Sequence, residues 1–235
     1  MIFEQLFDPE SSTYTYLLAS RAGGAALLVD PVQEQTAVYL EWIERLGLRL
    51  VIALDTHTHA DHITALGALR AATGCLSMMA EQSRAECVSA RCREGESLRI
   101  DELVLQPLYT PGHTDDSFSF YLDGEQPRVL TGDVLLIAGT GRTDFQNGDP
   151  YASYDSIFNK LLKLPPETQV FPAHDYRGRR VSTIGEERRS NPRLQVADAQ
   201  AYAALMNSLN LPQPRLMDIA VPANLRCGRL LDAPA

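Results

Sequence analysis

Several familiar catalytic signatures are absent from this 235-residue sequence. It has no Gly-x-Ser-x-Gly elbow, no Walker loop and no His-Glu-x-x-His pair, and the Gly-Thr-Gly at 139–141 lacks the third glycine of a dinucleotide-binding loop. Basic residues are also few, since 21 lysines and arginines stand against 30 acidic residues and the formal net charge is −9. Nucleic acid and anionic membrane surfaces require a basic footprint, so we expect neither as a partner.

The first residues lack a long apolar run. Residues 1–8 contain an acid at Glu4 and no stretch that could form a secretory h-region or a membrane span. They also lack the arginine-rich, acid-poor composition of an organellar transit segment. We therefore expect a cytoplasmic protein.

Cysteine is scarce and shows no metal-binding or redox spacing. The four cysteines lie at positions 75, 87, 92 and 227, and no two of them form a CxxC pair. In a reducing compartment such cysteines are expected to be free thiols rather than a disulfide framework. We expect them to pack as small buried or half-buried apolar groups.

Histidine, by contrast, is present in a clustered pattern. Residues 56–62 read Thr-His-Thr-His-Ala-Asp-His, residues 111–114 read Pro-Gly-His-Thr and residues 172–175 read Pro-Ala-His-Asp. No histidine lies outside these three clusters. Because imidazole is the commonest protein ligand of transition metals, the pattern predicts a metalloenzyme.

Hydrophobic periodicity places each cluster at the end of a strand. Apolar runs at 50–54, 103–109, 128–131 and 168–171 predict strands that lead into the histidine clusters and into Asp133. Strand ends of α/β sheets converge on one rim, where ligands bind. We expect one domain over residues 1–235, with a short helical extension at about 181–235. Further strands are expected at 13–19, 25–30, 75–79 and 117–122. Helices are expected at 38–46, 62–73 and 153–163, and over 181–209 with a break at Pro192.

The residues alone leave open whether one metal or two are bound. A tight turn at 57–62 can direct its side chains toward two points a few ångströms apart. A histidine at a later strand end would complete the ligands at each of these two positions, and a carboxylate between the positions could bridge two metal ions. The first point would be formed by His57, His59 and His113, and the second by Asp61, His62 and His174, with Asp133 between them.

The pattern of residues 56–62, followed by Gly-His, Gly-Asp and a late histidine, resembles the metallo-β-lactamase superfamily over the whole chain. This resemblance implies an α/β (α+β) fold, a four-layer αββα sandwich with the metal at one edge of its two sheets. The superfamily includes lactamases, thioester hydrolases, nucleases and oxygenases, so it does not fix the reaction. Four further blocks are similar to the persulfide dioxygenases (sulfur dioxygenases), namely residues 141–146, 174–176, 181–194 and 221–228.

The second resemblance implies a particular use of the site residues. One iron(II) per chain would be held by a two-histidine, one-carboxylate triad with three positions left open. Other residues would act around the iron through hydrogen bonds to its ligands or to ordered water. The implied ligands are His57, His113 and Asp133, and the implied surrounding residues are His59, Asp61, His62, His174 and Tyr176.

The implied reaction is the oxidation of glutathione persulfide by O2 to sulfite and glutathione. Glutathione carries two carboxylates, for which the resemblance implies Arg142 and Arg193 as clamps, with Thr114 adding a hydrogen bond. A homodimer is also implied. Two alternatives stay open: a hydrolase of glyoxalase II type that cleaves hydroxyacylglutathione thioesters at a dinuclear site, and a metal-containing persulfide or redox sensor that uses the cysteines. The chain after residue 180 is too short for the helical glutathione-binding domain of glyoxalase II.

Overall fold

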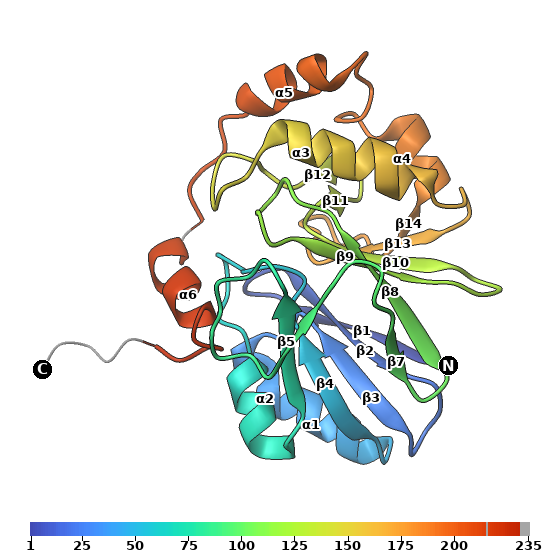
Figure 1. Ribbon diagram of the computed structural model, residues 1–235, viewed down its shortest axis with the longest axis vertical. Helices are drawn as coiled ribbons and strands as arrows, with labels where there is room; N and C mark the ends of the chain where they lie inside the picture. The colour runs from blue at the N-terminus through green and yellow to red at the C-terminus, as the bar shows by residue number, and fades with distance from the viewer. Residues whose placement is uncertain (215, 231–235) are drawn as a thin grey trace, which may run out of the picture. The chain divides into compact units, whose positions relative to one another are not determined.

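The computed structural model describes residues 1–214 and 216–230 (Figure 1). The chain divides into two compact units. Unit 1 comprises residues 1–92, residues 99–103 and the part of the chain from residue 212 onward. Unit 2 comprises residues 93–98 and 104–211.

Unit 1 is built on a mixed sheet whose strands lie side by side in the order of the sequence. The first three strands are antiparallel, and the third to the sixth are parallel. Strands β2 and β3 are buried at every residue, which accounts for their apolar sequences. The strands are β1 (Ile2–Asp8), β2 (Thr13–Ala19), β3 (Ala25–Val29), β4 (Arg49–Leu54), β5 (Leu76–Ala80) and β6 (Ala90–Cys92).

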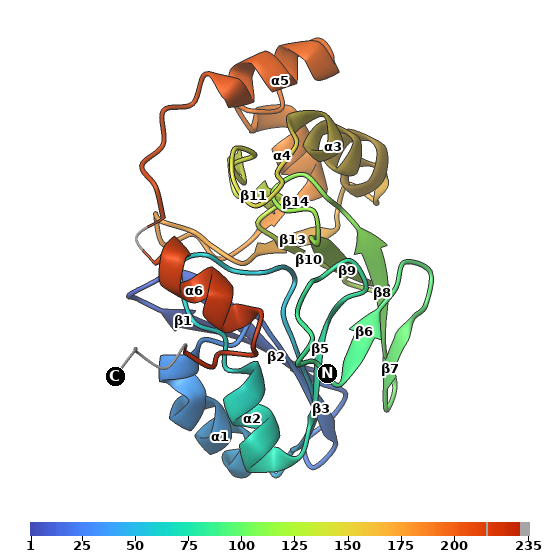
Figure 2. The ribbon, with the colours of Figure 1, turned by 60° about the vertical axis from the view of Figure 1, so that its left-hand side comes forward.

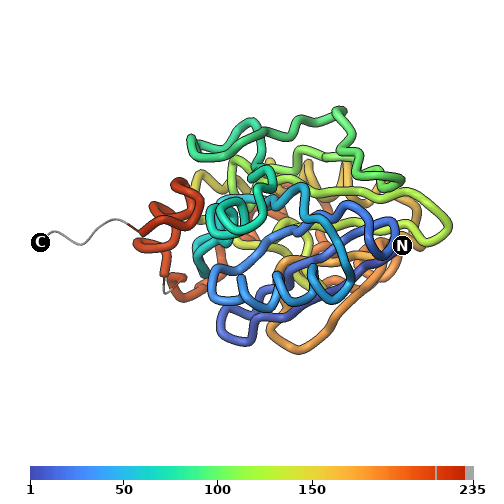
Figure 3. The backbone as a smooth tube through the Cα atoms, turned by 90° about the horizontal axis from the view of Figure 1, so that it is seen from below, coloured from blue at the N-terminus to red at the C-terminus, as the bar shows by residue number. Residues whose placement is uncertain are grey.

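Helices α1 (Thr36–Arg45) and α2 (Leu66–Thr73) pack on one face of this sheet (Figure 1). Tyr39 and Ile43 of α1 and Leu66 and Leu69 of α2 join side chains of the strands in one buried cluster. A short 3-10 turn at Gln33–Gln35 leads into α1. The C-terminal helix α6 (Met217–Asn224) also belongs to unit 1 and lies beside α2 (Figures 2 and 3).

Unit 2 has its own sheet, with the strand order β14-β13-β10-β9-β8. Strands β8, β9 and β10 are successively antiparallel, whereas β10 and β13 are parallel. Their apolar side chains share a buried core with the helices of this unit. The strands are β8 (Leu103–Tyr109), β9 (Phe118–Leu122), β10 (Arg128–Gly132), β13 (Gln169–Pro172) and β14 (Ser182–Thr183), with a small hairpin of β11 (Leu135–Leu136) and β12 (Gly139–Thr140).

The helices of unit 2 begin where capping residues stand. The Asp149 side chain accepts hydrogen bonds from the first amides of α3 (Pro150–Asp155), which has proline at its first position. Helix α3 continues through a π-helical turn and a 3-10 turn to residue 163. Thr183 caps α4 (Ile184–Ser190), and Asp198 caps α5 (Ala199–Asn207). The helical region expected at 181–209 is thus two helices, separated at residues 191–198, which include the expected break at Pro192.

Several elements are not predicted by the sequence, among them the hairpin of β11 and β12 and the two-residue strand β14. Strand β1 shows no clear alternation, and β6 and β7 (Leu98–Ile100) have three residues each, too few for a periodic signal. Helix α6 contains Pro222, which normally argues against a helix interior. Within the described residues, no helix combines the length and the apolar character needed to cross a membrane.

The expectation of free thiols is wrong for two of the four cysteines. Cys87 and Cys227 form a disulfide, although 140 residues separate them. Spacing rules detect only cysteines that are near each other in sequence, and here α6 returns to unit 1 and brings the partner with it. Cys75 and Cys92 are free and buried, as expected.

Candidate metal centre

In unit 1, the parallel arrangement of β3 and β4 brings Asp30 against the start of the histidine cluster. Asp30 follows β3 and Thr56 follows β4, so both lie at the carboxyl edge of the sheet. The Thr56 amide donates to Asp30 Oδ1 over 2.6 Å, and the Thr56 hydroxyl donates to Oδ2 over 3.0 Å. Asp30 therefore fixes Thr56, the residue that precedes the segment 57–64, called here the histidine loop.

These contacts also orient His57. Burial raises the pKa of Asp30 to about 6, with His57 and the Thr56 hydrogen bonds opposing the rise, so at pH 7 the carboxylate is mainly an acceptor. The single Thr56 hydroxyl proton is used on Asp30, and His57 Nδ1 lies 2.9 Å from the same hydroxyl oxygen. His57 Nδ1 must then donate its proton to Thr56, which leaves the Nε2 lone pair available for a metal.

The other polar side chains of the histidine loop form a second group. Donor atoms of His59, Asp61 and His62 all lie within 4.8 Å of one another. His59 Nε2 lies 3.1 Å from Asp30 Oδ1, and His62 Nδ1 lies 3.0 Å from Asp61 Oδ2. The ring centroids of His57 and His59 are 4.1 Å apart. His59 thus stands between His57 and the Asp61–His62 pair.

In unit 2, three residues of the predicted site gather at one edge of the sheet. Strands β8, β10 and β13 run in the same direction, so His113, Asp133 and His174 follow strands that end at the same edge. His174 Nδ1 lies 2.6 Å from Asp133 Oδ1, and His113 Nε2 lies 3.6 Å from Asp133 Oδ2. Asp133 therefore lies between the two histidines, and each histidine faces a different carboxylate oxygen.

The loop after β12 sets the orientation of His113. His113 Nδ1 donates to the carbonyl oxygen of Arg142 over 2.8 Å, which leaves Nε2 as the lone-pair nitrogen. This approach requires glycine at position 141, because a Cβ there would lie 2.1 Å from the Asp133 carbonyl oxygen and 2.9 Å from the His113 ring. The imidazole is thus held by backbone on its Nδ1 side, and its Nε2 faces Asp133.

The donor chemistry fits a non-haem metal ion. Unit 1 offers His57 Nε2, and unit 2 offers His113 Nε2 together with Asp133 Oδ2. Both imidazoles have their other nitrogen engaged, which is the usual arrangement of metal-binding histidines. Two imidazoles and one carboxylate are the donor set of the non-haem iron oxygenases.

The residues expected to bind substrate are held by neighbours in unit 2. The Arg142 guanidinium makes two hydrogen bonds to Asp144, of 2.6 and 2.8 Å. Arg193 is partly buried and donates to the carbonyl oxygen of Thr140. The buried Thr114 hydroxyl donates to Asp116 over 2.7 Å, so its proton is already used within the protein. Of the three, only the arginines have further donors to offer a ligand.

Tyr176 lies at the surface next to His174. Its side chain is 72% exposed, and its ring is nearly parallel to the imidazole, with centroids 6.1 Å apart. Asp175 between them is buried and accepts hydrogen bonds from the backbone amides of Arg177 and Arg179. This turn fixes the residue that precedes it, His174.

Sequence reasoning missed two residues that hold the histidine loop. Asp30 had a usable signal, because it directly follows an apolar strand, as Asp55 does. Asn224 had none, because it lies 160 residues from Thr64, whose amide donates to it.

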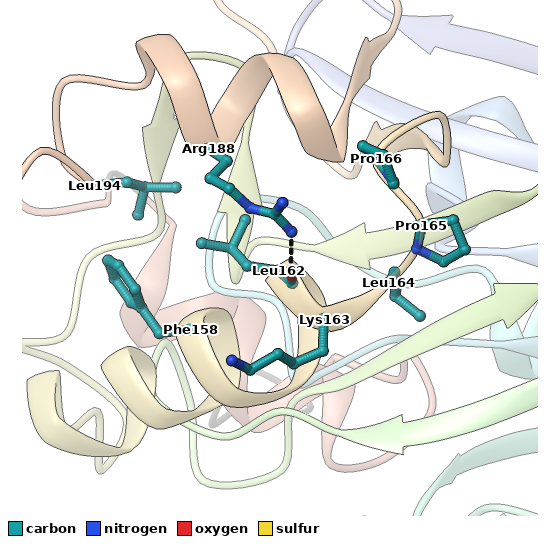
Figure 4. Close-up of a pocket in the computed structure, with 8 residues that line it drawn as sticks. All are labelled: Phe158, Leu162, Lys163, Leu164, Pro165, Pro166, Arg188 and Leu194. Atoms are coloured by element: carbon teal, nitrogen blue, oxygen red, sulfur yellow. Dashed lines mark hydrogen bonds between the residues drawn. The ribbon is translucent and has the colours of Figure 1, made fainter.

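A pocket of about 680 Å³ in unit 2 contains none of the predicted site residues (Figure 4). The Arg188 guanidinium crosses it and donates to the carbonyl oxygen of Leu162. The pocket is otherwise mainly apolar. It is lined by Phe158, Leu162, Lys163, Leu164, Pro165, Pro166, Arg188 and Leu194.

Comparisons with known proteins bear on both units. The profile of the metallo-beta-lactamase superfamily matches residues 8–85 and 93–174. The mouse protein "Persulfide dioxygenase ETHE1, mitochondrial" is 44% identical over 97% of this chain and 89% of its own length. The crystal structure of ETHE1 from Myxococcus xanthus is 50% identical, covers 97% of this chain and all of its own, and has a TM-score of 0.93. A hydroxyacylglutathione hydrolase of a Polaromonas species is 31% identical over 75% of this chain and 67% of its own length.

Proposed function

Because this chain belongs to the metallo-beta-lactamase superfamily and, within it, to the persulfide dioxygenase family, we propose that it oxidises glutathione persulfide with O2 at a single iron(II). The predicted metallo-β-lactamase fold is confirmed. The observation that carries the proposal is the similarity to ETHE1 proteins, which extends through both units. In the overall reaction, glutathione persulfide, O2 and water give glutathione, sulfite and two protons.

In this proposal His57, His113 and Asp133 hold the iron. Iron(II) held by these residues would supply the electron transfer that activates O2 toward the persulfide sulfur. The orientation of the two imidazoles supports the assignment, since Thr56 and the Arg142 carbonyl each engage the nitrogen that is not needed for the metal.

His174 would act on the iron site through Asp133. Its Nδ1–H donates to Asp133 Oδ1, so that carboxylate oxygen is occupied and Oδ2 remains for the metal. The same hydrogen bond fixes the rotation of the carboxylate. His59, Asp61 and His62 would play a similar part on the side of unit 1, where they hold one another and Asp30.

The two arginines would bind the carboxylates of glutathione. A protein with a net charge of −9 must supply local cations for a dianionic peptide. Arg142 is pre-positioned by Asp144, and Arg193 by Thr140. A guanidinium held on one side keeps its remaining donors in a fixed plane, which suits a carboxylate. Thr114 remains a proposed contact of this substrate site, and Tyr176 remains a proposed residue around the iron.

Neither alternative has comparable support. The hydrolase relative is similar over a smaller share of the chain, at lower identity. A cysteine-based sensor needs a reactive thiolate. Cys87 is bound in a disulfide, and burial raises the pKa of the Cys92 thiol to about 12. Homodimer formation and a cytoplasmic location stay predictions, and the mammalian relatives carry "mitochondrial" in their names.

The deciding experiment combines metal analysis with an oxygen electrode. The purified protein is expected to contain one iron per chain and to consume one O2 for each glutathione persulfide, with sulfite as product. Hydroxyacylglutathione thioester should not be cleaved. Two metal ions per chain with thioester cleavage and no oxygen uptake would replace the proposal by the hydrolase.

A further inference from the structure

The C-terminal segment of unit 1 lies directly against the end of the histidine loop. The amide of Gly67, at the start of α2, donates to the carbonyl oxygen of Cys227 over 3.0 Å. The approach is so close that a Cβ at position 67 would lie 2.4 Å from that oxygen. On the neighbouring turn, a Cβ at Gly228 would lie 2.2 Å from the carbonyl oxygen of Thr64. The two segments therefore have no room for side chains between their backbones.

Asn224, the last residue of α6, reaches into the histidine loop. Its Nδ2 donates to the carbonyl oxygens of His59 and His62, both over 2.9 Å. Its Oδ1 accepts from the amide of Thr64, also over 2.9 Å. The side chain is fully buried, so all three hydrogen bonds are shielded from water. One amide group thus ties together both ends of the turn that carries His59, Asp61 and His62.

The Cys87–Cys227 disulfide anchors the chain at Cys227, three residues after Asn224. Cys227 is buried and adopts a positive φ of 57°, a conformation that needs support from its surroundings. Its partner Cys87 lies in the connection between β5 and β6 and is only partly buried. On the other side of α6, the chain at 208–213 is mainly exposed. The disulfide is therefore the covalent anchor nearest to Asn224.

We propose that Asn224 is a positioning residue for the histidine loop and that the Cys87–Cys227 disulfide holds it there, so that a thiol reductant loosens the loop. The proposal rests on the proposed function only where it concerns the iron. It assigns a role to two residues of the C-terminal segment that touch neither the metal nor the substrate.

The redox step is an ordinary thiol–disulfide exchange. A thiolate attacks the more accessible sulfur, that of Cys87; the bond between the two cysteines breaks, and Cys227 leaves as a thiolate that takes up a proton. A second thiol releases Cys87 and forms an external disulfide, so two thiols supply the two electrons. Glutathione is such a thiol. Cys87 Sγ lies 3.6 Å from the Leu225 carbonyl oxygen, to which the thiol formed on reduction would donate, so reduction would loosen the segment rather than release it.

Hydrogen exchange of the metal-free protein tests the proposal without the reaction. The amides of Thr64 and Gly67 should exchange slowly in the oxidised protein and about tenfold faster after treatment with dithiothreitol, since each loses a buried hydrogen bond for part of the time. The Asp149 amide, which donates to the Gly112 carbonyl oxygen in unit 2, is the internal reference and should not change. Equal exchange with and without reductant would overturn the proposal, as would four alkylatable thiols in the untreated, denatured protein.

Variants separate the anchor from the residue it holds. Cys87→Ala should exchange at the fast rate without reductant, whereas Cys92→Ala removes a buried free cysteine and should respond to dithiothreitol as the parent does. Asn224→Ala should expose the Thr64 amide under both conditions. Asn224→Asp keeps the acceptor for Thr64 but loses both donors, so it should restore part of the protection. Slow exchange in Asn224→Ala would rule out the positioning role.

Metal binding gives a second readout. Competition with a chelator should show about tenfold weaker iron(II) binding in Cys87→Ala and in the reduced parent, a typical effect of disturbing groups around a metal site. If exchange responds to reduction but the protein consumes no O2 with persulfide, the proposed function fails and the role of Asn224 stands. If the protein consumes O2 with persulfide but its hydrogen exchange is insensitive to reduction, the proposed function stands and the role of the disulfide fails.

Discussion

The two units stabilise their metal-site residues in different ways. In unit 1 the histidines are almost completely buried, with His57 2% and His59 0% exposed, and their positions are set by buried polar side chains from distant segments. In unit 2 the side chains of His113 and Asp133 are 12% and 13% exposed, and their neighbours are the residues of adjacent strand ends. The site residues of unit 1 are therefore held on a buried loop by hydrogen bonds from distant segments. Those of unit 2 are grouped around the Asp133 carboxylate, where His113 and Asp133 are partly exposed.

This difference separates two tasks of such a site. A buried, braced loop fixes the geometry of a ligand at the expense of access. A partly exposed carboxylate is easier for a ligand to reach. Changes in unit 1 should therefore act mainly on how firmly metal is held, and changes in the arginines of unit 2 mainly on how substrate is held.

Removal of a proposed metal ligand should have the largest effect on iron(II) binding, and the effect should be equally large in the two units. We expect His113→Ala and His57→Ala each to lower iron(II) affinity more than about 100-fold and to abolish oxygen uptake, because the site keeps only two ligands. Metal analysis after gel filtration measures this. Full iron content in either variant would remove that histidine from the ligand set.

Removal of a side chain that is hydrogen-bonded to a proposed metal ligand should weaken metal binding more in unit 2 than in unit 1. His174→Ala frees Asp133 Oδ1, and we expect about 10- to 100-fold weaker metal binding. Thr56→Val is the matching change in unit 1, where it removes the hydroxyl between Asp30 and His57. Because further polar contacts brace the loop, its effect should be smaller. If Thr56→Val weakened metal binding more than His174→Ala, the expected difference between the two units would be wrong.

The arginines should affect substrate rather than metal. Arg193→Ala is expected to raise the KM for glutathione persulfide about tenfold at nearly unchanged kcat and iron content, as loss of one charge-assisted hydrogen bond predicts. Arg189→Ala, at an exposed position on α4, is the control. A fall in kcat at constant KM would contradict the role as a clamp.

The smallest effect concerns acid stability in unit 2. Burial alone would raise the pKa of Asp175, but hydrogen bonds from Arg179 and from the Arg177 amide outweigh it and hold the pKa below its ordinary 3.8. The stabilisation is thus present above about pH 4 and is lost as the pH falls through the folded-state value. Asp175→Asn should lower the free energy of unfolding by about 1 kcal/mol at pH 7, and the difference should shrink toward pH 3. A difference independent of pH would show that the charge is not involved.

The sequence predicted those parts of the site that depend on local order. Apolar runs that end shortly before His57, His113, Asp133 and His174 are sufficient to place these residues near strand ends, and the strands were found there. Asp133 lies between two histidines as expected, because parallel strands end at one edge. The metallo-β-lactamase fold was implied by the resemblance of the histidine motifs to that superfamily, and it is confirmed.

The braces of unit 1 could not be predicted in this way. The contacts of Asn224 and the pairing of Cys87 with Cys227 join segments at least 140 residues apart, and no local periodicity encodes such contacts. Proline in α6 also hid the helix that brings them together. Composition suggested free thiols, whereas the outcome depends on whether two cysteines meet in the folded chain.

The distance in sequence between Thr64 and Asn224 has a consequence for synthesis. The strands and helices of unit 1 up to residue 92 leave the ribosome early, yet the side chain that closes the histidine loop is made 160 residues after Thr64. A nascent chain can therefore fold most of unit 1 while the loop still lacks its closing contact. The part of the proposed metal centre in unit 1 is therefore completed only after the chain has been synthesised as far as residue 224.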